Sequence, residues 1–242
     1  MLCSNRRLSP RATWQRRNEQ QLIDLLVTED VAEEAALRIA KVAEAGGSVV
    51  LAGGSTPRRA YELAASADWT GAKVWFGDER CVPPDDERSN FRMAKEALLD
   101  RLAAPPAAIF RMPGELEPAE AAHQYAADIF EHEAEPFDLL LLGIGSDGHT
   151  ASLFPEKPAI SERNLLVTAV PEAGLEPFVP RISLTVPALV RAKEILFLVA
   201  GADKAEPVRE SFKIERSMTP AGIVARKARG RVTVLLDEPA NG

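Results

Sequence analysis

Short apolar runs recur along the chain, and segments with a different periodicity separate them. Runs bounded by glycine, proline or aspartate predict strands at residues 49–52, 74–76, 139–142, 165–170, 182–186, 195–200 and 232–236. Several of these runs are apolar at every position instead of every second one. This pattern is typical of strands buried on both faces of a mostly parallel sheet.

Helical periodicity appears between the runs and predicts helices over residues 30–45, 58–65, 91–102, 119–133 and 206–215. Asp30 and Glu33 form a capping box at the start of the first helix, and Gly46-Gly47 ends it. Strands that alternate with helices predict an α/β fold: a doubly wound, mostly parallel sheet sandwiched by helices. No repeat or low-complexity linker interrupts the pattern, so we expect a single domain over residues 14–242.

The composition narrows the class of protein. Apolar residues make up 46% and charged residues 27% of the chain, which is ordinary for a globular protein. The net charge of −7 argues against a nucleic-acid partner, and an anionic substrate would need a local basic pocket. The two cysteines, Cys3 and Cys81, fit neither a disulfide framework nor a zinc motif, so we expect reduced thiols and a cytoplasmic location. No apolar run is long enough to span a membrane.

The N-terminal segment has a different composition. Its first 18 residues contain five arginines and no acidic residue. An organelle presequence is one interpretation of such a segment. It lacks a clear apolar face, however, so we favour a flexible Arg-rich tail over residues 1–13.

A glycine-rich loop follows the first predicted strand. In open α/β sheets, ligands bind beyond the carboxyl ends of the strands. Gly53 and Gly54 let the backbone approach a ligand closely, and we expect Thr56 to cap the next helix with Pro57 at its first position. The amides at that helix start favour a phosphate bound by Gly53, Gly54, Ser55 and Thr56. An ordinary strand-to-helix turn explains the loop equally well.

Three basic residues stand at the ends of other predicted strands. Arg80 closes the segment 77–80, and its planar guanidinium could bind a phosphate or polarise a carbonyl group. Arg181 begins the run 182–186, and Lys204 follows the run 195–200. Each residue alone is more typical of a surface cation. Together they would supply positive charge at three strand ends of an acidic protein.

His149 lies in the loop 143–150, which follows the strand 139–142. The loop matches G-x-G-x-x-G formally, but Pro155 and Pro158 end any helix there too early for a dinucleotide site. A histidine after three glycines can act as a general base near neutral pH, and Asp147 could orient it. The alternative is a hydrogen-bonded structural histidine.

These loops resemble the 6-phosphogluconolactonase family, part of the glucosamine/galactosamine-6-phosphate isomerase superfamily. The matching stretches are GGSTP at 53–57, GDERCVPPDDERSNFRMAKEALL at 77–99, GIGSDGHTASLFP at 143–155, RISLT at 181–185 and GADKAEPV at 201–208. The resemblance implies a sugar-phosphate isomerase-like sandwich without cofactor or metal. It also implies hydrolysis of 6-phospho-D-glucono-1,5-lactone in the oxidative pentose phosphate pathway. We expect a monomer or a weak homodimer.

The resemblance also suggests how the residues share the chemistry. His149 would activate water, Asp147 would orient His149, and Arg80 would face the carbonyl group. The loop 53–56, Arg181 and Lys204 would bind the 6-phosphate.

Two alternative functions remain. Related glucosamine-6-phosphate deaminases carry a glutamate shortly after the histidine and tend to have tyrosine in place of Arg80. This chain has Phe154 at the glutamate position, which favours the lactonase. A non-catalytic sugar-phosphate sensor is the second alternative, and a sensor would be expected to have lost the base.

Overall fold

The computed structural model describes residues 23–132 and 134–242. Its main sheet has seven strands in the order β1-β10-β9-β6-β2-β3-β5, and every neighbouring pair is parallel. The strands are β1 (Ile23–Val27), β2 (Ser48–Leu51), β3 (Lys73–Phe76), β5 (Ala108–Ile109), β6 (Leu139–Leu142), β9 (Glu194–Val199) and β10 (Arg231–Leu236). This mostly parallel α/β architecture confirms the predicted fold class.

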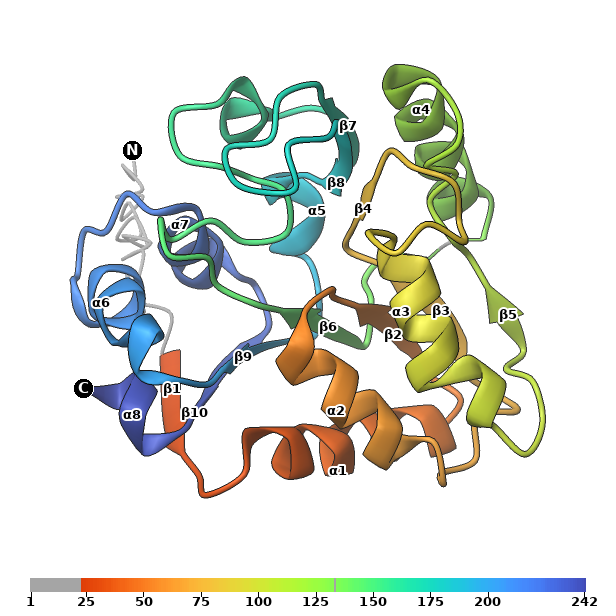
Figure 1. The fold of residues 1–242 in the computed structure, drawn as a ribbon, viewed down its shortest axis with the longest axis horizontal. Coiled ribbons are helices and arrows are strands. Elements are labelled where there is room, and N and C mark those ends of the chain that lie inside the picture. Colours follow the sequence, from red (N-terminus) through yellow and green to blue (C-terminus); the bar gives the residue numbers. More distant parts are fainter. Residues whose placement is uncertain (1–22, 133) are drawn as a thin grey trace, which may run out of the picture.

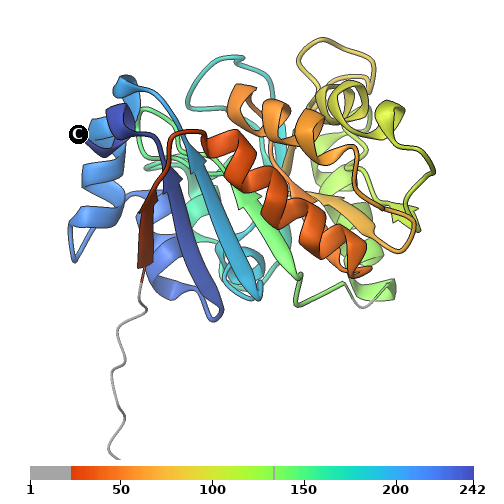
Figure 2. The ribbon, with the colours of Figure 1, turned by 90° about the horizontal axis from the view of Figure 1, so that it is seen from below.

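Helices cover both faces of this sheet. They are α1 (Val31–Glu44), α2 (Ser55–Ala64), α3 (Asn90–Ala97), α4 (Pro118–Glu131), α5 (Val186–Leu189), α6 (Ala205–Val208), α7 (Pro220–Lys227) and α8 (Glu238–Asn241). Figure 1 shows α1 and α2 on one side of the sheet and α5 and α7 on the other. In Figure 2, α1 and α2 lie in front of the strands, and the dark red β1 runs beside the dark blue β10.

The central strands are the most buried part of the core. All four residues of β2 and of β6 are buried, as their continuous apolar runs predicted. Helix α1 packs a stripe of small and aliphatic residues against the sheet, with Ala35 and Ile39 fully buried. Its first turn is held by Asp30, whose carboxylate accepts hydrogen bonds from the amides of Ala32 and Glu33.

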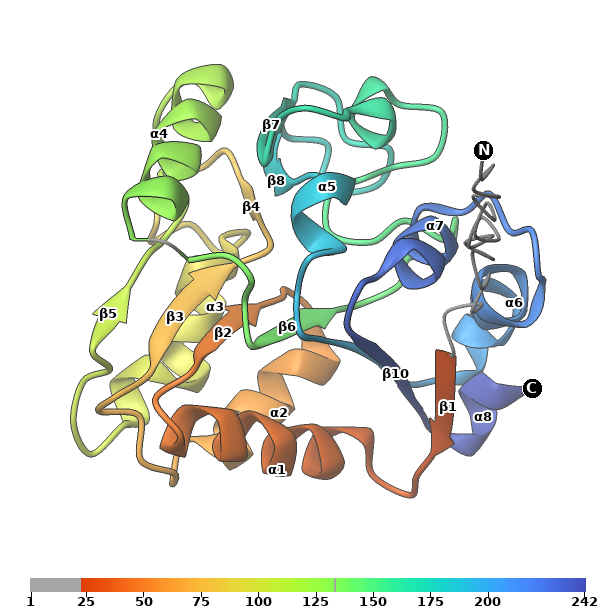
Figure 3. The same ribbon diagram turned by 180° about the vertical axis from the view of Figure 1, so that it is seen from behind.

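A second, smaller sheet corrects the sequence prediction. The predicted strands 165–170 and 182–186 correspond to β7 (Val167–Val170) and β8 (Arg181–Leu184), which pair antiparallel with each other. They do not join the parallel sheet. Instead β8 pairs antiparallel with β4 (Asp78–Arg80), a strand that was not predicted. The segment 171–180 is too short for the helical crossover that a parallel pair requires. Figure 3 shows this small sheet beside α4 and α5.

Several element boundaries also differ from the predictions. Thr56 is not the cap of α2: the helix begins at Ser55 and its cap is Gly54, at a φ of 111°. The predicted helix 206–215 divides into α6 and a π-helical turn, η4 (Arg209–Lys213). Short 3-10 turns are found at η1 (Leu99–Arg101), η2 (Pro158–Ser161) and η3 (Ala202–Lys204).

Some sequence predictions fall outside the part of the chain that is described. The Arg-rich tail proposed for residues 1–13 lies there, and so does residue 133, the predicted end of the fourth helix. Within the described residues, no helix is both long enough and apolar enough to cross a membrane.

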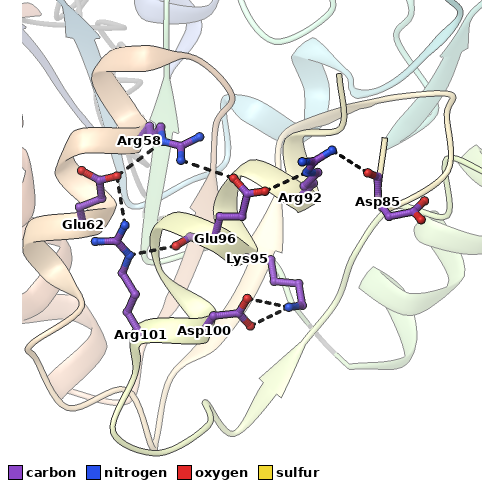
Figure 4. Close-up of polar contacts among 8 residues, drawn as sticks. All are labelled: Arg58, Glu62, Asp85, Arg92, Lys95, Glu96, Asp100 and Arg101. Atoms are coloured by element: carbon purple, nitrogen blue, oxygen red, sulfur yellow. Dashed lines mark hydrogen bonds and ion pairs between the residues drawn. The ribbon is translucent and has the colours of Figure 1, made fainter. Parts of the chain in front are cut away.

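Exposed ion pairs connect α2 to α3. Glu96 on α3 accepts a hydrogen bond from Arg92 at 2.8 Å and forms an ion pair with Arg58 of α2 at 3.4 Å (Figure 4). Arg101 adds a donor to the Glu96 carbonyl at 2.9 Å and an ion pair to Glu62 at 3.5 Å. Exposed pairs of this kind contribute little stability individually. Their position matters more, because both helices begin at the cleft described next.

Candidate active site

A cleft of about 270 Å³ opens beyond the carboxyl ends of β2, β6 and β9, which are neighbours or near neighbours in the parallel sheet. Among the residues that line it are Gly53, Gly54, Arg80, His149, Arg181 and Lys204. Residues from five separate segments of the chain therefore meet at one edge of the parallel sheet, as expected for an open α/β fold. Ser55 and Thr56 line a neighbouring groove instead, together with Asp30, Arg59 and Asp237.

His149 and Asp147 form a hydrogen-bonded pair in this cleft. The ring Nδ1 of His149 lies 2.6 Å from Oδ1 of Asp147, which also accepts a hydrogen bond from the His149 amide at 3.0 Å. Since a carboxylate only accepts, the neutral form of the ring that suits this contact has the proton on Nδ1 and the lone pair on Nε2. The side chain of His149 is 22% exposed, so Nε2 can meet a ligand while the ring stays packed. The ring of Phe154 lies 4.7 Å from the imidazole, centroid to centroid.

Two glycines of the histidine loop, Gly145 and Gly148, are required by its geometry. A Cβ atom on Gly145 would lie 2.0 Å from Nδ1 of His149, so only glycine leaves room for the ring. Gly148 has a φ of +78°, and a Cβ there would lie 2.7 Å from Thr219. The loop is closed by a hydrogen bond from the Gly145 amide to the His149 carbonyl at 2.9 Å.

Arg80 of β4 and Arg181 of β8 are directly paired on these two neighbouring strands of the small sheet. Arg181 is only 4% exposed, and its guanidinium donates to the carbonyls of Pro177 at 2.8 Å and Val179 at 3.3 Å. No described residue accepts from its Nη1. Burial lowers the pKa of Arg181, and the nearby Asp78 charge counteracts this effect.

The Arg80 guanidinium is anchored at one nitrogen only. Its Nη1 donates to the Arg88 carbonyl, while its Nε is buried with no hydrogen-bond partner among the described residues. A buried donor without a partner costs free energy unless a ligand or water satisfies it. The Nη2 of Arg80 also has no acceptor among the described residues, and since Arg80 lines the cleft, this nitrogen is the one available to a ligand.

Lys204 and the loop before α2 contribute the other positive groups. Lys204 ends the turn η3, and its Nζ lies 3.3 Å from Oδ2 of Asp203. Gly54 caps α2 without any side-chain hydrogen bond, and the first turn of α2 holds no acidic residue. The amides at the start of α2 are thus free to bind an anion beside the cleft.

Two further residues that line the cleft, Asp78 and Asn90, were not predicted from the sequence. Both belong to the stretch 77–99 that carried the family resemblance, but their contact depends on the tertiary fold. The neighbouring Glu79 is buried and accepts hydrogen bonds from Ser89 and from the amides of Arg80, Asn90 and Phe91. Burial raises the pKa of Glu79, and the hydrogen bonds from the three backbone amides oppose that shift. Glu79 thereby ties β4 to the start of α3.

Across residues 23–132 and 134–242, no group of three or more histidine, cysteine, aspartate or glutamate side chains could hold a metal ion. The polar groups that line the cleft include three cations, one histidine and the Asp78 carboxylate, and Asp147 is hydrogen-bonded to that histidine.

The chain is similar to proteins of one family. Residues 18–234 match the family model described as glucosamine-6-phosphate isomerases/6-phosphogluconolactonase. A 6-phosphogluconolactonase of Synechocystis is 39% identical over 236 residues, which cover 90% of this chain and 96% of that protein. A human 6-phosphogluconolactonase is 36% identical over 182 residues, which cover 73% of this chain and 69% of that protein.

Solved structures give the same result for the fold. A 6-phosphogluconolactonase from Thermotoga maritima superimposes with a TM-score of 0.77 at 31% identity, covering 90% of this chain and all of that one (100%). A monomeric glucosamine-6-phosphate deaminase has a TM-score of 0.77 at 21% identity and covers 90% of this chain and 98% of its own. At that identity, the likeness to the deaminase supports the fold alone.

Proposed function

Because the chain belongs to the family of glucosamine-6-phosphate isomerases and 6-phosphogluconolactonases, we propose that it hydrolyses 6-phospho-D-glucono-1,5-lactone to 6-phospho-D-gluconate. The reaction belongs to the oxidative pentose phosphate pathway, and we assign it to the cytoplasm. One observation carries the proposal: His149 Nδ1 is held 2.6 Å from Asp147 in a cleft that Arg80, Arg181 and Lys204 also line.

The hydrogen-bonded pair of His149 and Asp147, the dyad, performs the proton transfers. His149 Nε2 takes a proton from a water molecule, and the water oxygen bonds to the lactone carbonyl carbon. The tetrahedral intermediate collapses when the bond between that carbon and the ring oxygen breaks. The ring oxygen then receives the proton back from the imidazolium. Asp147 stabilises the imidazolium between these steps and keeps Nε2 directed at the cleft.

Arg80 stabilises the negative charge that develops on the carbonyl oxygen. Its Nη2 donates to no described residue, and Arg80 lines the cleft, so a ligand oxygen can accept a hydrogen bond from that nitrogen. A donor already in place for a developing oxyanion needs no reorganisation during the reaction.

The 6-phosphate is bound by the remaining positive groups of the cleft. Lys204, the unpaired Nη1 of Arg181 and the backbone at Gly53 and Gly54 supply donors around it. Ser55 and Thr56 contribute only through their backbone amides at the start of α2, which directly follow Gly54, because their side chains line the neighbouring groove.

Phe154 supports hydrolysis over deamination. It is 1% exposed, lies against the His149 ring and has the Arg181 guanidinium 5.9 Å from its ring centroid. A phenyl ring cannot exchange protons with sugar carbons, which ring opening and deamination require. The intact dyad likewise supports an enzyme over a non-catalytic sensor.

The test is a kinetic comparison on freshly prepared lactone. His149→Ala should lower the rate above spontaneous hydrolysis by roughly 10²–10⁴-fold, because it removes the general base. The control is His123→Ala on α4, which should leave the rate unchanged since His123 is exposed and outside the cleft. A folded His149→Ala protein with normal activity would refute the assignment. Unphosphorylated gluconolactone serves as the control substrate.

A further inference from the structure

Two buried carboxylates follow one another at β4, and they differ in how many hydrogen bonds they accept. Glu79 is 3% exposed and receives four donors, two on each oxygen. Asp78 is 8% exposed and receives two: Asn90 Nδ2 on Oδ1 at 3.1 Å and Ser152 Oγ on Oδ2 at 2.5 Å. A carboxylate can accept about four hydrogen bonds. Asp78 thus retains acceptor capacity, and it lines the cleft, which Glu79 does not.

The amide of Asn90 adds a second acceptor. Its Nδ2 donates to the Asp78 backbone carbonyl at 2.9 Å and to Asp78 Oδ1 at 3.1 Å. Both partners are acceptors, so the NH₂ group must face them and the amide oxygen must face the other way. That oxygen lies towards Gly53, where a Cβ would come within 2.1 Å of it. No described residue donates to it.

These groups are held rigidly. Ser152 is fully buried, and its backbone amide donates a hydrogen bond to Ser183 Oγ at 3.2 Å, which fixes its position. Asn90 is 3% exposed and begins α3, where its own amide donates to Glu79. Asp78 and Asn90 therefore form a rigid wall of the cleft, in which hydrogen bonds connect the small sheet, α3 and Ser152.

The chemistry of this wall selects the kind of ligand group that binds there. It presents acceptors only, so it binds donors and repels a phosphate or a carboxylate. The donors of a sugar lactone are its ring hydroxyls, whereas its carbonyl and ring oxygen only accept. We propose that Asp78 and Asn90 form a specificity-determining subsite that recognises ring hydroxyls of the substrate, an inference that rests on the proposed lactonase function.

The experiment combines variants with substrate analogues. The kcat/KM values are measured for the parent lactone 6-phosphate and for its 2-deoxy, 3-deoxy and 4-deoxy analogues. The unmodified protein should disfavour at least one analogue by about 10- to 100-fold, the range for a hydrogen bond to a charged group. Asp78→Asn keeps the shape of the side chain, and it should reduce that preference to less than about a third of its size.

A second variant displaces the Asn90 side chain and leaves the aspartate at position 78 in place. Gly53→Ala would place a Cβ 2.1 Å from the Asn90 oxygen, so the amide must shift. This variant should also weaken the preference for the parent over a deoxy analogue. Effects on phosphate binding cancel in that ratio, because all substrates carry the phosphate. Asp85 is an exposed residue of the loop between β4 and α3, and Asp85→Asn is the matched control, which should keep the full preference.

Each outcome decides the inference. A uniform loss of kcat on all substrates in Asp78→Asn would overturn it, since Asp78 would then act in the chemistry. A lowered melting temperature with unchanged preferences in both variants would overturn it as well. Failure of the unmodified protein to hydrolyse the parent lactone would instead refute the proposed function. The subsite is then judged by calorimetric titration of 6-phosphogluconate and its deoxy analogues, where equal affinities would reject it.

Discussion

The position of the His149 ring depends on the absence of a side chain at Gly145, and this dependence can be tested with one methyl group. In Gly145→Ala the added Cβ would lie 2.0 Å from His149 Nδ1, 2.1 Å from Cε1 and 2.9 Å from Asp147 Oδ1. Ordinary contact begins at 3.4 Å, so the ring would have to move by about 1.4 Å. Gly145 does not have a positive φ, and alanine therefore introduces no backbone strain.

The expected result is a large loss of turnover in a folded protein. Misplacing a catalytic group by about 1 Å can cost roughly 10²-fold, and loss of the general base costs roughly 10²–10⁴-fold. We expect kcat of Gly145→Ala to fall within that range. The assay follows acid release at constant pH, because each lactone hydrolysed yields one carboxylic acid. Spontaneous hydrolysis is subtracted from each trace.

The control is a neighbouring glycine. At Gly143 an added Cβ would meet no atom within 4 Å, so Gly143→Ala should keep kcat within about threefold. A rise in KM alone is compatible with this reasoning, because Gly143 also lines the cleft. Wild-type kcat in Gly145→Ala, with an unchanged circular dichroism spectrum, would refute the argument that this glycine positions the base.

Three further predictions concern other parts of the cleft. Lys204→Ala should raise KM for the phosphorylated lactone by about 10- to 100-fold and leave unphosphorylated gluconolactone unaffected, because it removes a charge-assisted contact; equal effects on both substrates would place Lys204 away from the phosphate. Burial, with the nearby Glu79 charge, raises the pKa of Cys81 to about 11, so in a Cys3→Ser background alkylation should be slow at pH 7.5 and should accelerate about tenfold per pH unit up to about pH 10. Alkylation at the rate of free cysteine at pH 7.5 would contradict that shift. The protein should release no ammonia from glucosamine 6-phosphate, because Phe154 fills the position of the acid; release that Glu156→Gln abolishes would overturn the lactonase proposal.

The parts of the site that the sequence predicted are those built from local geometry. His149, Asp147 and Gly145 lie within five residues of one another, and the loop they form follows directly from a buried strand. Their contact needs no distant partner. The strands β2, β3, β6, β9 and β10 were predicted because continuous apolar runs are distinctive, and the structure confirms them.

The parts that escaped prediction depend on tertiary contacts or on weak patterns. Asp78 is hydrogen-bonded to Asn90, which lies 12 residues further along the chain, and to Ser152, which lies 74 residues further. No local periodicity connects these residues. Strand β1 was not predicted because Asp24 interrupts its apolar run, and at the edge of the sheet four of its five residues are exposed. The small sheet was misassigned because β7 and β8 carry the same apolar runs as parallel strands.

The strand order has a consequence for how this chain is made. β10 lies between β9 and β1, so β1 pairs with it alone among the described strands of the sheet. During synthesis, β1 leaves the ribosome long before β10 and must wait for it before it can join the sheet. The strands β2, β3, β5 and β6, which adjoin one another, can assemble earlier with α1 and α2. The β1 edge of this sheet therefore cannot fold in order from the N-terminus onward. A nascent chain that stops before residue 231 has no β10, so β1 has no strand to pair with.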